Sequence, residues 1–299
     1  MAMIQVESLC RRFGPTMAIR DISFSVERGE IVGFLGPNGA GKTTTMRILT
    51  GSLGATAGQV SVGGIDVATN PLGVKRLVGY LPEAPPVYGD MTVRGYLRFC
   101  ARLKKAKSPK ESVEKMIERV GLSPVAHRVI GHLSKGYRQR VGIAQALVHD
   151  PQVLILDEPA SGLDPAQRVE IRGLVKDLSE GDVTVVLSTH VLPEVEAICD
   201  RVIIIDRGRI VAHDAVEGLS APGRDVTLVV ARPDPALVAT LTALEGVLEV
   251  TPGDEGVIQV RADRDVREEV ASVAVPHGLL ELQGRQGLEQ QFLRLTGEG

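Results

Sequence analysis

Eight consecutive residues near the amino terminus have the types and spacing needed to hold an anion. They match Gly-x-x-x-x-Gly-Lys-Ser/Thr and are Gly36, Pro37, Asn38, Gly39, Ala40, Gly41, Lys42 and Thr43. Glycines let the backbone approach an anion closely, and successive N–H groups form a nest around it. A buried apolar stretch precedes the pattern and a predicted helix follows it. This order predicts a nucleotide phosphate loop, with Lys42 near the β and γ phosphates and the Thr43 hydroxyl on Mg²⁺. A chance turn in a chain of 33 glycines is the alternative.

Acidic and imidazole side chains follow two apolar stretches farther along the chain. Asp157 and Glu158 come directly after residues 153–156, and His190 comes shortly after residues 183–187. Unbroken apolar runs of this length predict parallel strands that are buried on both faces, and ligands bind at the carboxyl ends of such strands. Asp157 is therefore a candidate Mg²⁺ contact and Glu158 a candidate for polarising the attacking water. Acids also end strands simply because they are exposed there, and a lone histidine after a strand indicates little by itself.

A second predicted helix start has the features of an anion site. Ser134 and Gly136 begin a helix whose apolar face carries Val141, Ala144, Leu147 and Val148. One chain rarely needs two such helix starts for one nucleotide. This start is therefore either an ordinary N-cap with a basic first turn or a surface that closes on a nucleotide held by a second copy.

Two further residues are candidates because of their positions. Phe13 is one of the few aromatic residues and lies upstream of the glycine-rich loop. Its ring could stack on adenine, or it could be an ordinary half-buried aromatic side chain. Glu83 follows the predicted strand 78–81 in a proline-rich loop, where the prolines hold it at the strand end.

The pattern of elements predicts two domains. Short strands, the first ones antiparallel, precede the phosphate loop, and residues 58–67 predict a hairpin. A helical block at about residues 90–148 interrupts an alternation of strands and helices. After a linker at residues 220–223 the order is βαββαβ plus a last helix through Leu288, Phe292 and Leu295, which suggests a small split-βαβ domain. We therefore expect domains at residues 1–219 and 220–299.

Composition narrows the classes of function. The net charge of −3 lacks the basic surplus of nucleic-acid-binding proteins, so we expect no nucleic-acid partner. Cys10, Cys100 and Cys199 lie far apart without metal-like spacing, which is typical of thiols in a reducing cytoplasm. No apolar run reaches the roughly 18 to 20 residues that span a bilayer, and no secretory signal is evident. We expect a cytoplasmic chain that meets a membrane only through a partner.

Taken together, five motifs resemble the ordered motif set of ABC-transporter ATPase subunits. They cover about residues 1–215 and are Gly36–Thr43, Leu133–Tyr137, Leu154–Glu158, Ser161–Asp164 and His190. The resemblance is closest to the drug-export-like, ABC-2 type branch, and residues 287–296 are similar to the carboxyl-terminal tail of that branch. It implies an α/β P-loop NTPase fold with a mixed-sheet core, an antiparallel β subdomain, an inserted helical subdomain and a small α+β carboxyl-terminal domain.

The resemblance also implies roles for the matching residues. Phe13 would stack on adenine, and residues 38–44, ending at Thr44, would hold phosphates together with the Lys42 ammonium. Mg²⁺ would be held by Thr43 and supported by Asp157. Glu158 would be the catalytic carboxylate, and His190 would contact the γ-phosphate. The residues that would act across a dimer of two copies are Asp164, Ser134 and Gly136.

Two positions depart from the pattern of the family. In the signature loop, commonly Leu-Ser-Gly-Gly-Gln, Lys135 and Tyr137 replace the third and fifth residues. Glu83 stands where a glutamine usually faces Mg²⁺ and water. A carboxylate can still ligate Mg²⁺ directly or through water, although it adds negative charge beside the phosphates.

The resemblance predicts the ATP-binding and ATP-hydrolysing subunit of an exporter. Two copies would enclose ATP and Mg²⁺, and their closure would drive separate integral membrane permease subunits at the inner face of the cell membrane. A soluble ABC ATPase that acts on ribosomes or DNA is the alternative, but such proteins typically carry two cassettes or a long coiled-coil insertion. An importer subunit is a further alternative.

Overall fold

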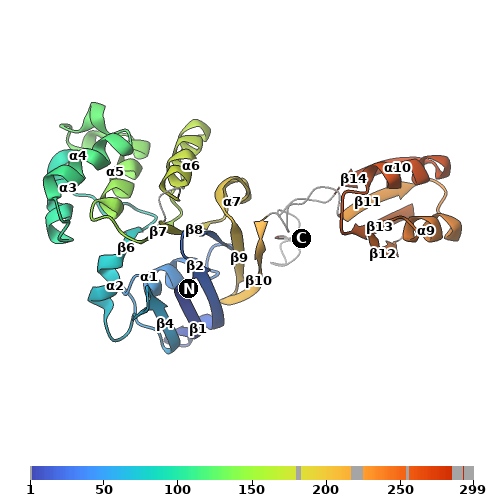
Figure 1. Ribbon diagram of the computed structural model, residues 1–299, viewed down its shortest axis with the longest axis horizontal. Coiled ribbons are helices and arrows are strands. Elements are labelled where there is room, and N and C mark those ends of the chain that lie inside the picture. The colour runs from blue at the N-terminus through green and yellow to red at the C-terminus, as the bar shows by residue number, and fades with distance from the viewer. Residues whose placement is uncertain (1, 180–182, 217–224, 254–255, 285–291, 293–299) are drawn as a thin grey trace. The chain divides into compact units, whose positions relative to one another are not determined.

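The computed structural model describes residues 2–179, 183–216, 225–253, 256–284 and 292. It divides into two compact units, Met1–Asp214 and Ala215–Gly299, which Figure 1 colours from blue to yellow and from orange to red. The expected linker at residues 220–223 lies outside the described residues. So does the expected last helix with the tail at 287–296, apart from Phe292, which is buried.

An antiparallel sheet with the order β2-β1-β4-β5 begins the first unit. Its strands are β1 (Ala2–Phe13), β2 (Thr16–Glu27), β4 (Ala57–Val62) and β5 (Ile65–Asp66). The expected antiparallel strands and the hairpin of residues 58–67 are confirmed. The prediction of short strands is wrong for β1 and β2, because they form one long hairpin in which shifts of register restore the alternation of buried and exposed side chains.

A six-stranded sheet with the order β10-β9-β3-β8-β7-β6 forms the second layer of this unit. Its strands are β3 (Ile31–Leu35), β6 (Val78–Leu81), β7 (Val153–Asp157), β8 (Thr184–Thr189), β9 (Arg201–Asp206) and β10 (Arg209–Ala215). Strand β8 lies between β3 and β7 and is parallel to both. The carboxyl ends of these three strands therefore meet at one edge of the sheet, where the predicted site residues follow them.

Helices flank this sheet and fill a separate block. Helix α1 (Lys42–Leu49) follows β3, α2 (Pro71–Leu77) precedes β6, α6 (Pro165–Ser179) follows β7, and α7 (Leu192–Ile198) follows β8. Between β6 and β7 come α3 (Val93–Leu103), α4 (Pro109–Arg119) and α5 (Lys135–Leu147), with 3₁₀ turns at Ser123–Val125 and Ile130–His132. Figure 1 shows α3, α4 and α5 gathered into one block, as expected for an insertion.

One hydrophobic core joins the two sheets of the first unit. Buried residues of the antiparallel sheet pack in the same cluster as Phe34 of β3, Met46 of α1 and Ile155 of β7. The rings of Phe24 and Phe34 have centroids 5.6 Å apart across this contact. The elements that flank the phosphate loop are therefore fixed by close packing on both sides.

The second unit has a sheet of its own. Its elements are β11 (Asp225–Val230), α9 (Pro235–Thr242), β12 (Val247–Pro252), β13 (Val257–Ala262), α10 (Arg267–Ala274), a 3₁₀ turn at Val275–His277 and β14 (Leu279–Gly284). The sheet order is β12-β13-β11-β14, and each pair is antiparallel. The order of strands and helices is the one expected from the sequence. Buried side chains of β11, β13, α9 and α10 form a separate core.

Candidate active site

The glycines of the loop between β3 and α1 have a steric purpose. Gly39 and Gly41 have φ angles of 82° and 114°, which side chains rarely adopt. Gly36 lies so close to β9 that a Cβ atom there would be 2.3 Å from the carbonyl oxygen of Ile205. The start of the loop is thus packed directly against β9.

A hollow of about 280 Å³ lies over this loop. It is lined by Ala18, Pro37, Asn38, Gly39, Gly41, Lys42, Thr43, Thr44, Glu83, Glu158, Ser161 and His190. Most of the residues predicted to touch phosphate, metal or water are thereby brought together. Gly36 and Ala40 belong to the loop but do not line the hollow, and Ala40 is buried beneath it.

Three ionisable side chains form a chain of contacts across the hollow. The Lys42 ammonium donates to the carbonyl oxygens of Gly36 at 2.6 Å and Pro37 at 3.2 Å, and lies 3.4 Å from Glu158 Oε1. The other carboxylate oxygen of Glu158 is 2.8 Å from His190 Nδ1. The side chains of Lys42 and Glu158 are 6% and 9% exposed, whereas His190 is half exposed. Glu158 therefore has a cation on one side and an imidazole open to solvent on the other.

Asp157 lies behind this chain of contacts and is fully buried at the end of β7. Its Oδ1 accepts a hydrogen bond from the Ser188 hydroxyl, while Oδ2 has no hydrogen-bond partner. The N–H of Glu158 donates to the carbonyl oxygen of Ser188 at 3.0 Å. No pattern in the sequence marks Ser188 as a site residue, because the contact depends on the register between β7 and β8.

The buried carboxylate of Glu194 stabilises the turn that carries His190. The Thr189 hydroxyl donates to Glu194 Oε2 at 2.9 Å and accepts from the Val191 N–H at 3.0 Å. Burial raises the pKa of Glu194, and this hydrogen bond opposes the rise. His190 is therefore held on a short, internally bonded turn rather than on a free loop.

The oxygen atoms around the hollow suit a hard cation such as Mg²⁺. Thr43 and Glu83 line the hollow, whereas Asp157 is not among its lining residues and has a buried Oδ2 without a hydrogen-bond partner. Within the described part of the chain, no group of three or more histidine, cysteine or acidic residues could hold a metal by itself. A Mg²⁺ ion here would thus need phosphate oxygens of the nucleotide to complete its ligands, which is usual for this metal.

Ser134 and Gly136 lie away from the phosphate loop, at a second hollow of about 260 Å³. This hollow is also lined by Gly121, Tyr137, Arg140, Gln167, Glu170 and Ile171. Ser134 is the N-cap of α5, and its hydroxyl accepts from the Tyr137 N–H at 3.3 Å. A single chain therefore has two separate helix starts, at Lys42 and at Lys135, each beside a hollow of its own.

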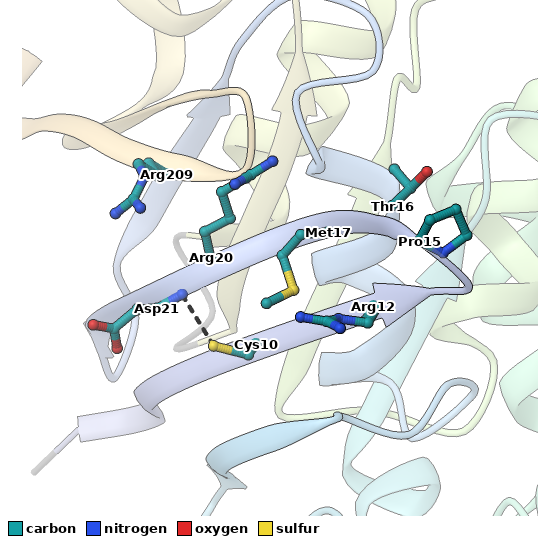
Figure 2. A pocket seen from close by; sticks show the side chains of 8 residues that line it. All are labelled: Cys10, Arg12, Pro15, Thr16, Met17, Arg20, Asp21 and Arg209. Carbon is teal, nitrogen blue, oxygen red and sulfur yellow. Dashed lines mark hydrogen bonds between the residues drawn. The ribbon is translucent and has the colours of Figure 1, made fainter.

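Phe13 ends strand β1 and is 43% exposed, with the Arg11 guanidinium 4.4 Å from its ring centroid. It does not line the phosphate hollow. The same hairpin borders a third hollow, of about 430 Å³, lined by Cys10, Arg12, Pro15, Thr16, Met17, Arg20, Asp21 and Arg209. Figure 2 shows its arginines coming from three strands and the hydrogen bond from the Asp21 N–H to Cys10 Sγ. This hollow contains no predicted site residue.

Comparison with known proteins decides the family. The family model described as "ABC transporter" matches residues 19–161. The uncharacterized ABC transporter ATP-binding protein YxlF of Bacillus subtilis is 43% identical over 210 residues, which cover 70% of this chain and 69% of YxlF. The linearmycin resistance ATP-binding protein LnrL of the same organism is 34% identical over 99% of this chain and 98% of its own length. This chain belongs to the ABC-transporter ATP-binding proteins.

Solved structures agree with this assignment. The structure of cbiO1 from Clostridium perfringens, described as part of the ABC transporter complex cbiONQ, superimposes with a TM-score of 0.67. It is 28% identical, and the match covers 73% of this chain and 90% of cbiO1. The first unit therefore has the ABC ATPase cassette fold, to which the chain adds a carboxyl-terminal sheet region.

Family membership settles the general activity of this ABC protein. It is an ATP-binding, ATP-hydrolysing subunit of a transporter. The solved structure of the ATP-binding cassette MJ0796, which is 22% identical to this chain, is described as dimeric and bound to ADP and Pi. Among the helices of the described residues, none combines the length and apolar character needed to cross a bilayer.

Proposed function

We propose that this ABC protein energises an exporter, in which ATP joins two copies of the chain and their closure drives separate permease subunits. The observation that carries the proposal is the pair of distinct helix starts, at Lys42 and at Ser134, which line different hollows. Similarity to LnrL over nearly the whole chain supports export, since that protein is named for resistance to linearmycin.

Each ATP site would combine parts of both copies. The loop Gly36–Thr43 of one copy would hold the phosphates, and Ser134 with Gly136 of the other would close on the γ-phosphate. Ser134 is exposed at this helix start and lines the second hollow, where the N–H groups of the first turn of α5 could meet an approaching anion. Phe13 would stack on the adenine with the ring face that Arg11 leaves free.

Within this site the residues would divide the work of hydrolysis. Mg²⁺, when bound, would neutralise phosphate charge, and Thr43, Glu83 and Asp157 would hold it. Glu158 would accept a hydrogen bond from the attacking water and polarise it, and His190 would contact the γ-phosphate. Lys42 would turn from Glu158 to the phosphates. Phosphoryl transfer depends mostly on such positioning and charge stabilisation.

An exposed aromatic cluster in the helical block supports a permease contact. Tyr88 packs against Tyr96 and Phe99, with ring centroids 5.9 and 5.8 Å apart. Tyr88 and Phe99 are 56% and 41% exposed, and Leu103 is 69% exposed. Exposed aromatic and apolar side chains in one place are typical of a protein-binding surface. A permease bound there would hold this chain at the inner face of the cell membrane.

The test of the assembly is Glu158→Gln. ATP binding should persist, since the loop is unchanged. Turnover should fall on the order of 10²- to 10⁴-fold, as for the loss of a general base. Size-exclusion chromatography with light scattering should then detect a dimer only when ATP is present.

The matched control adds Ser134→Arg to Glu158→Gln. A bulky cation at the start of α5 should block closure, so ATP should bind without forming the dimer. Hydrolysis by Glu158→Gln at nearly the wild-type rate would contradict the role of Glu158. Dimers that form equally well with Ser134→Arg would contradict the shared site.

A separate variant tests the permease contact. The double variant Tyr88→Ala/Phe99→Ala should lose the copurifying membrane protein and keep ATP-dependent dimerisation.

A further inference from the structure

Ser188 contacts both acidic residues at the end of β7. Its hydroxyl donates to Asp157 Oδ1, and the Glu158 N–H is shared between the Ser188 carbonyl oxygen at 3.0 Å and its hydroxyl oxygen at 3.2 Å. Ser188 lies directly opposite Asp157 in the parallel register of β7 and β8, and it is fully buried. One side chain and its backbone thus connect the two carboxylates.

The hydrogen bond to Asp157 decides which of its oxygens is free. Oδ1 is occupied by Ser188, so Oδ2 is left as a buried oxygen without a partner. A carboxylate that is held through one oxygen cannot rotate freely, and its second oxygen keeps a fixed direction toward a ligand. Without the hydroxyl, the carboxylate of Asp157 would lose the hydrogen bond from Ser188 that orients it.

The contacts with Glu158 hold an unusual backbone conformation. Glu158 has a φ angle of 49°, in the left-handed region that non-glycine residues seldom occupy. The shared hydrogen bond from its N–H ties this conformation to β8. Its carboxylate then lies between Lys42 at 3.4 Å and His190 at 2.8 Å.

We propose that Ser188 is a positioning residue for ATP hydrolysis, which orients Asp157 toward the metal and fixes the turn at Glu158. The proposal rests on the roles proposed above for these two carboxylates. Residues that orient metal ligands typically contribute about 10- to 100-fold to metal affinity or activity. Ser188 should act in this way without touching nucleotide, water or metal.

The test measures metal binding separately from turnover. Mn²⁺ affinity is followed by electron paramagnetic resonance with the β,γ-imido analogue of ATP, which is not hydrolysed. Ser188→Ala should weaken Mn²⁺ binding about 10-fold and lower kcat about 10- to 100-fold. Affinity for the analogue without metal should stay within about two-fold, since the phosphate loop is untouched. Ser188→Thr, which keeps the hydroxyl, should recover most of both losses.

Thr184→Val is the matched structural control. Thr184 lies on the same strand, is fully buried, and its hydroxyl oxygen accepts from the Gly29 N–H at 3.0 Å, away from the site. This variant should keep the wild-type Mn²⁺ affinity. If Ser188→Ala does not fold, Ser188→Cys takes its place. The thiol is a weaker hydrogen-bond donor than the hydroxyl, so Mn²⁺ affinity and kcat should fall by less than is expected for Ser188→Ala.

The proposal would be overturned if the Ser188 variant keeps the wild-type kcat and Mn²⁺ affinity. It would also be overturned if Thr184→Val loses as much of both as the Ser188 variant does.

Asp157→Asn distinguishes this inference from the proposed metal site. If Asp157→Asn weakens Mn²⁺ binding and Ser188→Ala does not, the metal role of Asp157 stands and the positioning role of Ser188 fails. If Asp157→Asn leaves Mn²⁺ affinity unchanged, both fail.

Discussion

The ion pair between Lys42 and Glu158 predicts an energetic coupling that can be measured without nucleotide. The ammonium nitrogen and Oε1 are 3.4 Å apart, and both side chains are less than one-tenth exposed. At an effective dielectric constant of about 20, the gross attraction at this distance is about 5 kcal/mol. Desolvation of both charges offsets much of it. Removing one partner of such a pair usually costs about 3 kcal/mol, because the other charge stays buried.

A double-mutant cycle isolates this coupling. Lys42→Met should destabilise the first unit by about 3 kcal/mol, because the buried Glu158 carboxylate then loses the contact with the ammonium. The coupling free energy is the sum of the losses in Lys42→Met and in Glu158→Gln minus the loss in the double variant, and it should be about 2 kcal/mol. Urea unfolding followed by tyrosine fluorescence suits the measurement, because the four tyrosines all lie before residue 215 and there is no tryptophan.

Arg94 and Glu114 provide the control pair. Their charged atoms are closer, at 2.8 Å, but their side chains are 25% and 44% exposed. The cycle with Arg94→Met and Glu114→Gln should give about 0.5 kcal/mol or less, as is usual for exposed pairs. A coupling for Lys42 and Glu158 no larger than this control would refute the reasoning, since burial would then not strengthen the pair.

Three further predictions concern other parts of the molecule. Burial, together with the charge of Lys104, lowers the pKa of His149 from 6.5 to about 4. The unfolded chain therefore binds a proton at a higher pH than the folded chain does. As a result, the free energy of unfolding should fall by up to about 3 kcal/mol as pH drops from about 6.5 to about 4. Urea titrations should show that the free energy of unfolding of His149→Gln depends less on pH than that of the wild type. The same pH dependence in both would contradict the assignment to His149. Gly36→Ala should lower ATP affinity at least about 10-fold, as measured by calorimetry, because its Cβ meets an unyielding backbone oxygen. Gly54→Ala should bind ATP normally, because the added Cβ atom would point into open space. Removing residues 222–299 should leave the first unit folded, because each unit has its own core. If the second unit braces the dimer, ATP-dependent dimerisation of Glu158→Gln should weaken, and unchanged dimerisation would exclude that role.

The sequence by itself determined the features that depend on short stretches. The phosphate loop is readable because its glycines, lysine and threonine follow one another at fixed spacing between a strand and a helix. The helical block and the order of elements in the second unit are readable because apolar periodicity is local. The location of Asp157, Glu158 and His190 at one sheet edge also followed, because parallel strands that are buried on both faces end at the same side.

Only the tertiary structure decided which side chains touch. Ser188 meets Asp157 because β7 and β8 pair in one particular register, and a shift of one residue would turn each of these side chains to the opposite face. The glycine at position 36 is required by a carbonyl group of Ile205, far away in the chain. The sequence predicted Ser134 at a helix start. The tertiary structure adds that this helix start lines a different hollow from the one over the phosphate loop of the same chain. Such contacts join residues distant in sequence, and no local pattern encodes the register and packing that bring them together.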